Sequence, residues 1–132
     1  MALVKIFTEK ENYGDLVDHV ANSVKLVSAA ALNVPDLPTT PDGIETVYVE
    51  GLDLVGIDYI LEIIAVVRPN QQAIAGGIID GLNQIYPGKL FSVYFVNIAE
   101  DGMANTPRPC SESRPISMEE AVNLAKEGVN HG

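Results

Sequence analysis

Arg68 is the residue whose position most readily supports chemistry. It follows the apolar run Tyr59–Val67 and precedes Pro69-Asn70, where an amphipathic segment begins. A guanidinium group can bind a carboxylate through two parallel hydrogen bonds, and the free N–H groups of a helix N-terminus also favour an anion. The alternative is an exposed arginine that pairs with one of the 18 acidic side chains. From the residues alone, both interpretations stay open.

The other reactive side chains carry weaker signals. Tyr94 lies in an apolar run, where its hydroxyl either orients a ligand or belongs to a core tyrosine that reaches an edge. His19 lies off the apolar stripe of its segment and is interpreted as a surface histidine, and Cys110 has no neighbouring base in the sequence. No His/Cys/Asp/Glu cluster has metal-ligand spacing, and no phosphate-loop motif is present, so we expect neither a metal nor a cofactor.

Length and charge limit the classes of function. The 132 residues have the length of one domain, and we expect a single domain over 1–132. A net charge of −10 with only eight basic residues argues against nucleic acid and against anionic membranes as partners. The single cysteine and the absence of a signal-peptide pattern favour the cytoplasm. The longest apolar run contains Glu62 and is about half the length needed to span a bilayer.

The pattern strand–helix–strand occurs twice, in halves of about 1–50 and 58–98. In the first half, apolar residues recur at helical spacing after an expected N-cap at Asn12. In the second half, a helix lies between the apolar runs at 59–67 and 90–98. Right-handed crossovers then give a four-stranded sheet with both helices on one face. Because the run at 90–98 is apolar at nearly every residue, we expect burial on both faces, with a second subunit over the open face.

Two further features bear on packing. Three glycines in the second helix predict that the sheet packs closely against its backbone: Gly76, Gly77 and Gly81. The C-terminal extension over 100–132 begins as an irregular stretch, and Ser117 with Glu120 forms a capping-box pattern that predicts a short last helix.

Three short motifs carry a resemblance to a known family. They are Asp58-Tyr59, Val67-Arg68-Pro69-Asn70-Gln71 and Val93-Tyr94-Phe95. Together with the order of elements from about 3 to 105, they resemble the tautomerase superfamily, which includes macrophage migration inhibitory factor, 5-carboxymethyl-2-hydroxymuconate isomerase and cis-3-chloroacrylic acid dehalogenase. The resemblance implies an α/β tautomerase-like fold and a homotrimer that buries the bare sheet face. The same order of elements also fits a ferredoxin-like sandwich.

The resemblance also implies roles for individual residues. The family uses an N-terminal proline as its base, whereas this chain has Ala2, whose amine is free only if Met1 is removed. Arg68 matches the arginine that binds the substrate carboxylate, Tyr94 and Asn97 match the pocket lining, and Asn105 lies where the dehalogenase has a carboxylate.

These matches give three hypotheses. The first is isomerisation or a related proton transfer on a small 2-oxo or enol carboxylate. The second is a catalytically silent, trimeric ligand-binding or structural protein, and the third is a ferredoxin-like regulatory domain. Dehalogenation is disfavoured because Gln71 replaces the family's second arginine and Asn105 replaces the carboxylate.

Overall fold

The structure, a computed structural model, describes residues 2–51, 54, 56–99 and 114–131. The strands are β1 (Ala2–Thr8), β2 (Ile44–Glu50), β3 (Tyr59–Val66) and β4 (Phe91–Ile98). The helices are η1 (Lys10–Asn12), α1 (Tyr13–Asp15), η2 (Leu16–Val20), α2 (Ala21–Leu32), η3 (Pro41–Gly43), α3 (Gln71–Ile85) and α4 (Met118–His131). The two predicted strand–helix–strand units are therefore present, followed by the predicted last helix.

The four strands form one mixed sheet in the order β2-β1-β3-β4. Each unit places its two strands side by side and parallel, β1 with β2 and β3 with β4, while β1 and β3 join the units antiparallel. A ferredoxin-like sandwich is built from split units, in which another strand separates the two strands of a unit. The observed order therefore excludes the ferredoxin-like alternative and agrees with the tautomerase-like one.

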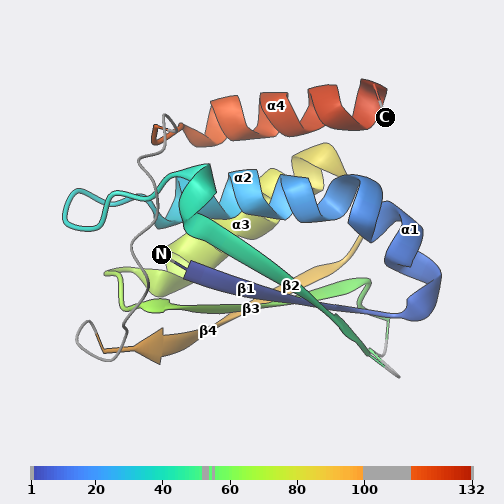
Figure 1. Cartoon of the computed structure of the whole chain (residues 1–132), viewed down its shortest axis with the longest axis horizontal. Helices are drawn as coiled ribbons and strands as arrows, with labels where there is room; N and C mark the ends of the chain where they lie inside the picture. Colours follow the sequence, from blue (N-terminus) through green and yellow to red (C-terminus); the bar gives the residue numbers. More distant parts are fainter. Residues whose placement is uncertain (1, 52–53, 55, 100–113, 132) are drawn as a thin grey trace.

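The core lies between the sheet and the helices on its covered face. Alternate residues of β1 and β3 are buried, because successive strand side chains point to opposite faces. Figure 1 shows α2 and α3 side by side over this face of the sheet. The largest side chains that are fully buried there include Ile6, Leu16, Leu32, Ile44, Tyr59, Leu61, Ile63, Ile78 and Leu82.

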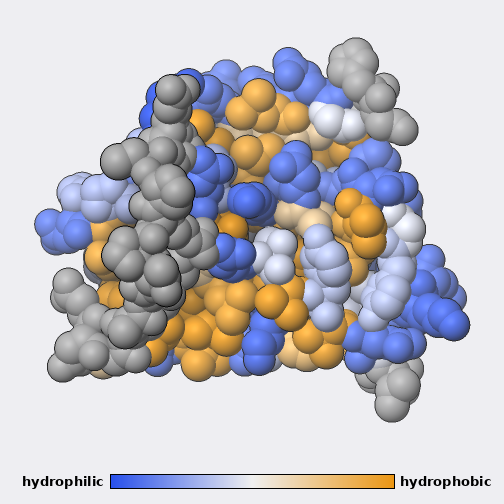
Figure 2. All heavy atoms as spheres, in the orientation of Figure 1, coloured by the Kyte–Doolittle hydropathy of each residue, from blue (hydrophilic) through white to orange (hydrophobic). Residues whose placement is uncertain are grey.

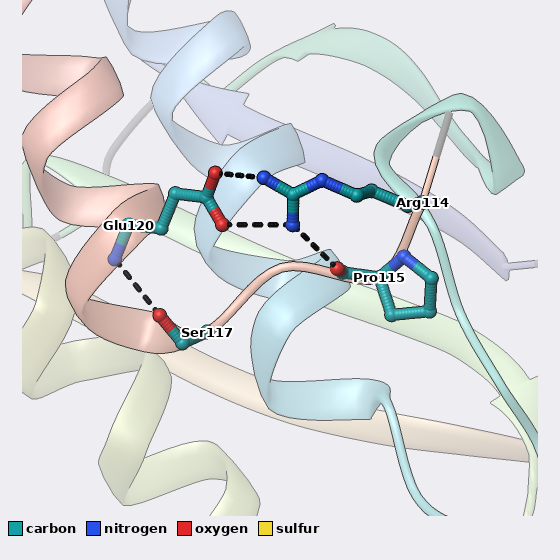
Figure 3. A network of polar contacts seen from close by, with 4 residues as sticks. All are labelled: Arg114, Pro115, Ser117 and Glu120. Atoms are coloured by element: carbon teal, nitrogen blue, oxygen red, sulfur yellow. Dashed lines mark hydrogen bonds and ion pairs between the residues drawn. The ribbon is translucent and has the colours of Figure 1, made fainter. Parts of the chain in front are cut away.

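Helix α4 adds a third layer, which the sequence does not predict. It packs on the outer side of α2 and α3, away from the sheet (Figure 1), and it buries Ala121, Val122 and Ala125. The predicted cap is confirmed, because the backbone N–H of Glu120 donates to Ser117 Oγ at 3.1 Å. The carboxylate of Glu120 instead pairs with the exposed Arg114 (Figure 3), which raises the pKa of that guanidinium.

The prediction that the sheet packs against the three glycines of α3 is wrong. A Cβ on Gly81 would lie 2.9 Å from Met118 Sδ and 3.0 Å from Val27 Cγ1, so the close neighbours are α4 and α2. A Cβ on Gly76 or Gly77 would meet nothing within 4 Å. A side chain at Gly81 would thus crowd Met118 and Val27 where three helices meet, and the other two glycines have room for one.

The expected N-cap at Asn12 is also wrong. Asn12 has helical φ and ψ values, and the structure gives it no side-chain cap hydrogen bond. Its side-chain amide donates instead to Thr8 Oγ1 at 3.1 Å, at the end of β1. The following helix is continuous from Tyr13 to Leu32 but contains a π-helical turn over η2.

The opposite face of the sheet carries apolar side chains on either side of one polar row, and none of the described helices covers it. The register places Phe7, Ile60, Ile64 and Val96 on this face, and Val96 is 41% exposed. Hydrophobic surface over the sheet is visible in the lower part of Figure 2. Among the residues that the structure describes, the run at 90–98 is thus covered on one side only.

Candidate functional site

Arg68 is buried, with 4% of its surface exposed, and three of its N–H groups already have acceptors. Nε donates to Leu32 O at 3.1 Å, Nη1 donates to Val66 O at 2.7 Å, and Nη2 donates to Thr39 Oγ1 at 3.1 Å. The side chain therefore joins the end of β3, the end of α2 and the loop that follows α2.

The hydrogen-bond acceptors around Arg68 explain why its charged side chain can be buried. Leu32 is the last residue of α2, so the guanidinium sits at a helix C-terminus, where a positive charge is favoured. Burial lowers the pKa of Arg68 from its ordinary value, because desolvation disfavours the charged form. All three acceptors are neutral oxygens, and a guanidinium has five N–H groups. Two N–H groups, one on each Nη atom, are left over from these three bonds.

Ala2 and Asn97 lie in the same cross-strand row as Ala65, at the end of the sheet that Arg68 follows. Ala2 is the first residue of β1, fully buried and paired with Ile44. The register pairs Leu3 with Ile64, which puts Ala2 opposite Ala65, and Ala65 pairs with Asn97. Neighbouring strands lie about 4.8 Å apart, so Ala2 and Asn97 are separated by roughly 10 Å on the helix-covered face.

Gln71 is hydrogen-bonded to the side chain of Asn97. Its Nε2 donates to Asn97 Oδ1 at the N-terminus of α3. Asn70, just before it, adopts the left-handed conformation with φ at 59°, which turns the chain from β3 into the helix. The structure therefore brings Ala2, Arg68 and Asn97 to one end of the sheet.

Tyr94 lies on the other face of the sheet, away from these residues. The register pairs it with Glu62, which pairs in turn with Lys5, so the three form a polar row across the open face. Lys5 Nζ is 3.9 Å from Glu62 Oε2. Desolvation and a hydrogen bond to the Glu62 carboxylate raise the pKa of Tyr94, which is 43% exposed. Within one chain, Tyr94 and Asn97 therefore lie on opposite faces of the sheet.

Other predicted features can be placed only in part. Asn105 and Cys110 lie outside the described residues, as does the rest of 100–113. The residues that the structure describes contain no group of three or more His, Cys, Asp or Glu side chains able to hold a metal ion. No described helix has the length and apolar character needed to cross a membrane.

The opposite end of the sheet contains residues that the sequence does not single out. A cavity there is lined by Asp15, His19, Val20, Tyr59, Tyr86, Lys89 and Val129. His19, interpreted from the sequence as a surface residue, is half-buried in this lining. The residues come from η2, α4 and the ends of β3 and α3, so no local motif marks them.

Comparisons with known proteins were made for the sequence and for the fold. No protein-family model matches the chain, and no curated protein matches it. Three solved structures are similar to it in fold.

The first is a domain of unknown function (DUF1904) from Sebaldella termitidis, 15% identical, with a TM-score of 0.48, covering 80% of this chain and 95% of that one. The second is a macrophage migration inhibitory factor-like protein from Entamoeba histolytica, 12% identical, with a TM-score of 0.46, covering 80% and 93%. The third is a fused 4-OT wild-type asymmetric trimer, 12% identical, with a TM-score of 0.49, covering 78% and 91%. The likeness concerns the arrangement of strands and helices.

Proposed function

We propose that this protein is a homotrimeric, tautomerase-type protein that transfers a proton on a small 2-oxo or enol carboxylate. The observation that supports the proposal best is the cross-strand row at the start of β1, where the buried Ala2 and Ala65 and the exposed Asn97 lie side by side at the end of the sheet followed by Arg68. Loss of Met1 would place a primary amine at this position. The Asn97 amide would line the site.

The proposed base is the amine of Ala2 in the chain without Met1. An unperturbed α-amine has a pKa of about 8, and the apolar neighbours of Ala2 would lower it by disfavouring the ammonium form. The neutral amine would take the proton from the enol oxygen of the substrate. The resulting ammonium would return a proton to the neighbouring carbon, which completes the isomerisation without a cofactor.

The proposed carboxylate site is the pair of N–H groups that Arg68 does not use for Leu32, Val66 and Thr39. A bound carboxylate would also compensate a buried positive charge whose partners among the described residues are neutral. Charge-assisted bonds of this kind are stronger than neutral ones.

The decisive experiment compares two preparations of the chain, one with Met1 and one without it, each verified by intact mass. The assay follows enol-to-keto conversion of a phenylpyruvate-like probe. We expect conversion only without Met1, and Ala2→Pro in the processed chain should increase it. Equal rates in the two preparations, or no conversion in either, would contradict a role for the amine.

Arg68→Ala should reduce conversion as well, but its effect must be separated from unfolding. The variant is assayed together with its folded fraction by circular dichroism, because Arg68 also joins three parts of the core. Loss of conversion per folded molecule supports the carboxylate role. Unchanged conversion per folded molecule contradicts it.

A second candidate is a non-catalytic trimer that binds a ligand or acts as a structural protein. It is favoured by the same guanidinium, because three of its donors are committed to protein oxygens and hold the fold together. This candidate predicts no conversion by the processed chain and a gain only in Ala2→Pro.

Both candidates include a homotrimer that covers the apolar face of the sheet. The support is the exposure of Val47, Tyr94 and Val96 on a face that no described helix covers. Native mass spectrometry is expected to give three times the mass of one chain. A monomer would contradict this part of the proposal.

A further inference from the structure

The open face of the sheet carries one pair of opposite charges within an apolar surface. Lys5 of β1 and Glu62 of β3 are directly opposite each other in the register. Apolar side chains lie on either side of this pair along the strands. They are Leu3, Ile64 and Val96 on one side and Phe7 and Ile60 on the other.

The contact between Lys5 and Glu62 leaves much of their binding capacity unused. Lys5 Nζ lies 3.9 Å from Glu62 Oε2, which is longer than a hydrogen bond of about 2.7–3.2 Å. An ammonium group has three N–H donors, and a carboxylate accepts about four hydrogen bonds, of which Tyr94 supplies one here. The two side chains are 39% and 17% exposed. A molecule that covers this face can therefore reach both of them.

Covering the face changes what the pair requires. Contacts with the apolar side chains around it exclude water, and an ammonium group that loses water without gaining an acceptor is strongly destabilised. The distance to Glu62 is too long for that carboxylate to be the acceptor within one chain. The covering surface must therefore bring an acceptor to Lys5, and it can bring a donor to Glu62.

A second copy of the chain meets both requirements at once. It carries the cation and the anion in the same row of the same surface, so copies related by a rotation can satisfy one another reciprocally. The net charge of −10 makes copies repel each other. Lys5 is the only basic residue in the four strands that the structure describes, so it is the cation with which this face can attract another acidic copy.

We propose that Lys5 of one copy and Glu62 of a neighbouring copy form reciprocal ion pairs across the open face. This inference rests on the homotrimer of the proposed function and deepens it by naming the charged contact that selects the partner. The apolar side chains supply contact area in many orientations. The ion pairs select one of them, because a shifted copy would leave Lys5 against apolar side chains without an acceptor.

The test is reversal of each charge in the full chain, separately and together. Sedimentation velocity measures the dissociation constant of the assembly, and circular dichroism verifies that each variant is folded. Lys5→Glu and Glu62→Lys should each weaken assembly by about tenfold or more, because like charges then meet across the interface. The double variant should assemble as the wild type does, because it restores the pair in reverse order.

Mixing the two single variants distinguishes contacts between copies from contacts within one chain. A chain with Lys5→Glu lacks a cation on this face, and a chain with Glu62→Lys lacks the central anion. If the ion pairs join neighbouring copies, the mixture should form oligomers that contain both chains, which native mass spectrometry identifies by mass.

Arg114→Glu and Glu120→Lys are the matched controls. They change the net charge by the same amounts at an exposed ion pair beside α4, away from the sheet. Both should assemble as the wild type does. If a reversed charge prevents folding, Lys5→Met and Glu62→Gln test the same contact, because each leaves the residue of the neighbouring copy uncompensated and should weaken assembly.

The inference is overturned if the single reversals assemble as tightly as the wild type, if the mixture contains no mixed oligomer, or if the controls weaken assembly equally. In these cases a homotrimer of the wild type still stands. A wild-type chain that stays monomeric overturns both. A wild-type dimer with the expected pattern of reversals contradicts the trimer and supports the ion pairs.

Discussion

Each end of the sheet has a buried polar side chain, but only one of the two is hydrogen-bonded to described residues. At the end where β1 begins, the guanidinium of Arg68 is buried and donates to Leu32 O, Val66 O and Thr39 Oγ1. At the end where β3 begins, the hydroxyl of Tyr59 is equally buried and has no partner among the described residues.

The difference separates a buried polar side chain that stabilises the fold from one that destabilises it. Satisfying a buried donor rigidifies the surrounding structure, whereas an unsatisfied one retains the cost of desolvation until something binds. Arg68 thus contributes to stability and keeps only part of its binding capacity. Tyr59 makes no such bond and reduces stability. Mutations at the two ends should therefore change stability in opposite directions.

The largest effect is expected for Arg68→Met. It removes the donors of two backbone carbonyls and of Thr39 in the core, and we expect the free energy of unfolding to fall by about 3 kcal/mol. Urea unfolding followed by circular dichroism measures it. The matched control is Arg114→Met, which removes an exposed ion pair and should cost less than about 1 kcal/mol. Equal losses of unfolding free energy in the two variants would mean that the buried bonds of Arg68 contribute no more than an exposed ion pair.

The second-largest loss of unfolding free energy is expected at alkaline pH, through ionisation of Tyr59. Burial raises the pKa of Tyr59 from 10.0 to about 12. Below pH 10 the phenol is neutral in both the folded and the unfolded chain. Between pH 10 and about 12 the unfolded chain releases this proton while the folded chain keeps it, so the free energy of unfolding falls as pH rises. The loss is expected to be on the order of 2 kcal/mol.

Tyr59→Phe isolates this contribution from those of the other tyrosines. Urea titrations of the variant over the same pH range should show a smaller decline in stability than the wild type. An identical decline would mean that Tyr59 does not titrate in the folded chain as described.

The two tyrosines of the cavity should respond with opposite signs at neutral pH. Tyr86→Phe removes the hydrogen bond to Ser23 and should lower the free energy of unfolding by about 1 kcal/mol. Tyr59→Phe removes an unpartnered hydroxyl and should raise it by up to about 1 kcal/mol in the ligand-free protein. Thermal unfolding of both variants measures the difference. Destabilisation by Tyr59→Phe would indicate that the hydroxyl already has a partner in the ligand-free protein.

The smallest effect is expected for Gln71→Ala, which removes the exposed bond to Asn97. Water replaces both partners at an exposed site, so the loss should be about 0.5 kcal/mol or less. Urea unfolding measures it next to Arg68→Met. A loss of unfolding free energy above about 1 kcal/mol would contradict this expectation and show that the bond between Gln71 and Asn97 stabilises the fold.

The fold could be predicted from the sequence because its signals are local. The apolar runs at 59–67 and 90–98 fix β3 and β4, and the cap at Ser117 fixes the start of α4. The third layer could not be predicted, because an amphipathic helix reveals that one face is buried and leaves open what covers it. The prediction about the glycines was wrong for the same reason. Gly81 lies against Met118 and Val27, which are far from it in the sequence.

The candidate site could be predicted only as a set of positions. The sequence points to Arg68, but its partner Leu32 lies at a helix end 36 residues away and its partner Thr39 in a loop 29 residues away. Tyr94 and Asn97 belong to the same apolar run, but they are three residues apart. Because side chains alternate along a strand, an odd separation places the two on opposite faces of the sheet. The cavity around Tyr59 lacks any local pattern because separate elements supply its lining.

Helix α4 has a consequence for how the chain completes its core during synthesis. Its buried residues Ala121, Val122 and Ala125 are made after every strand of the sheet and after both helices that they cover. A nascent chain that ends before them can pair all four strands, but it leaves the outer side of α2 and α3 open to water. The last layer therefore closes only after α4 has been synthesised.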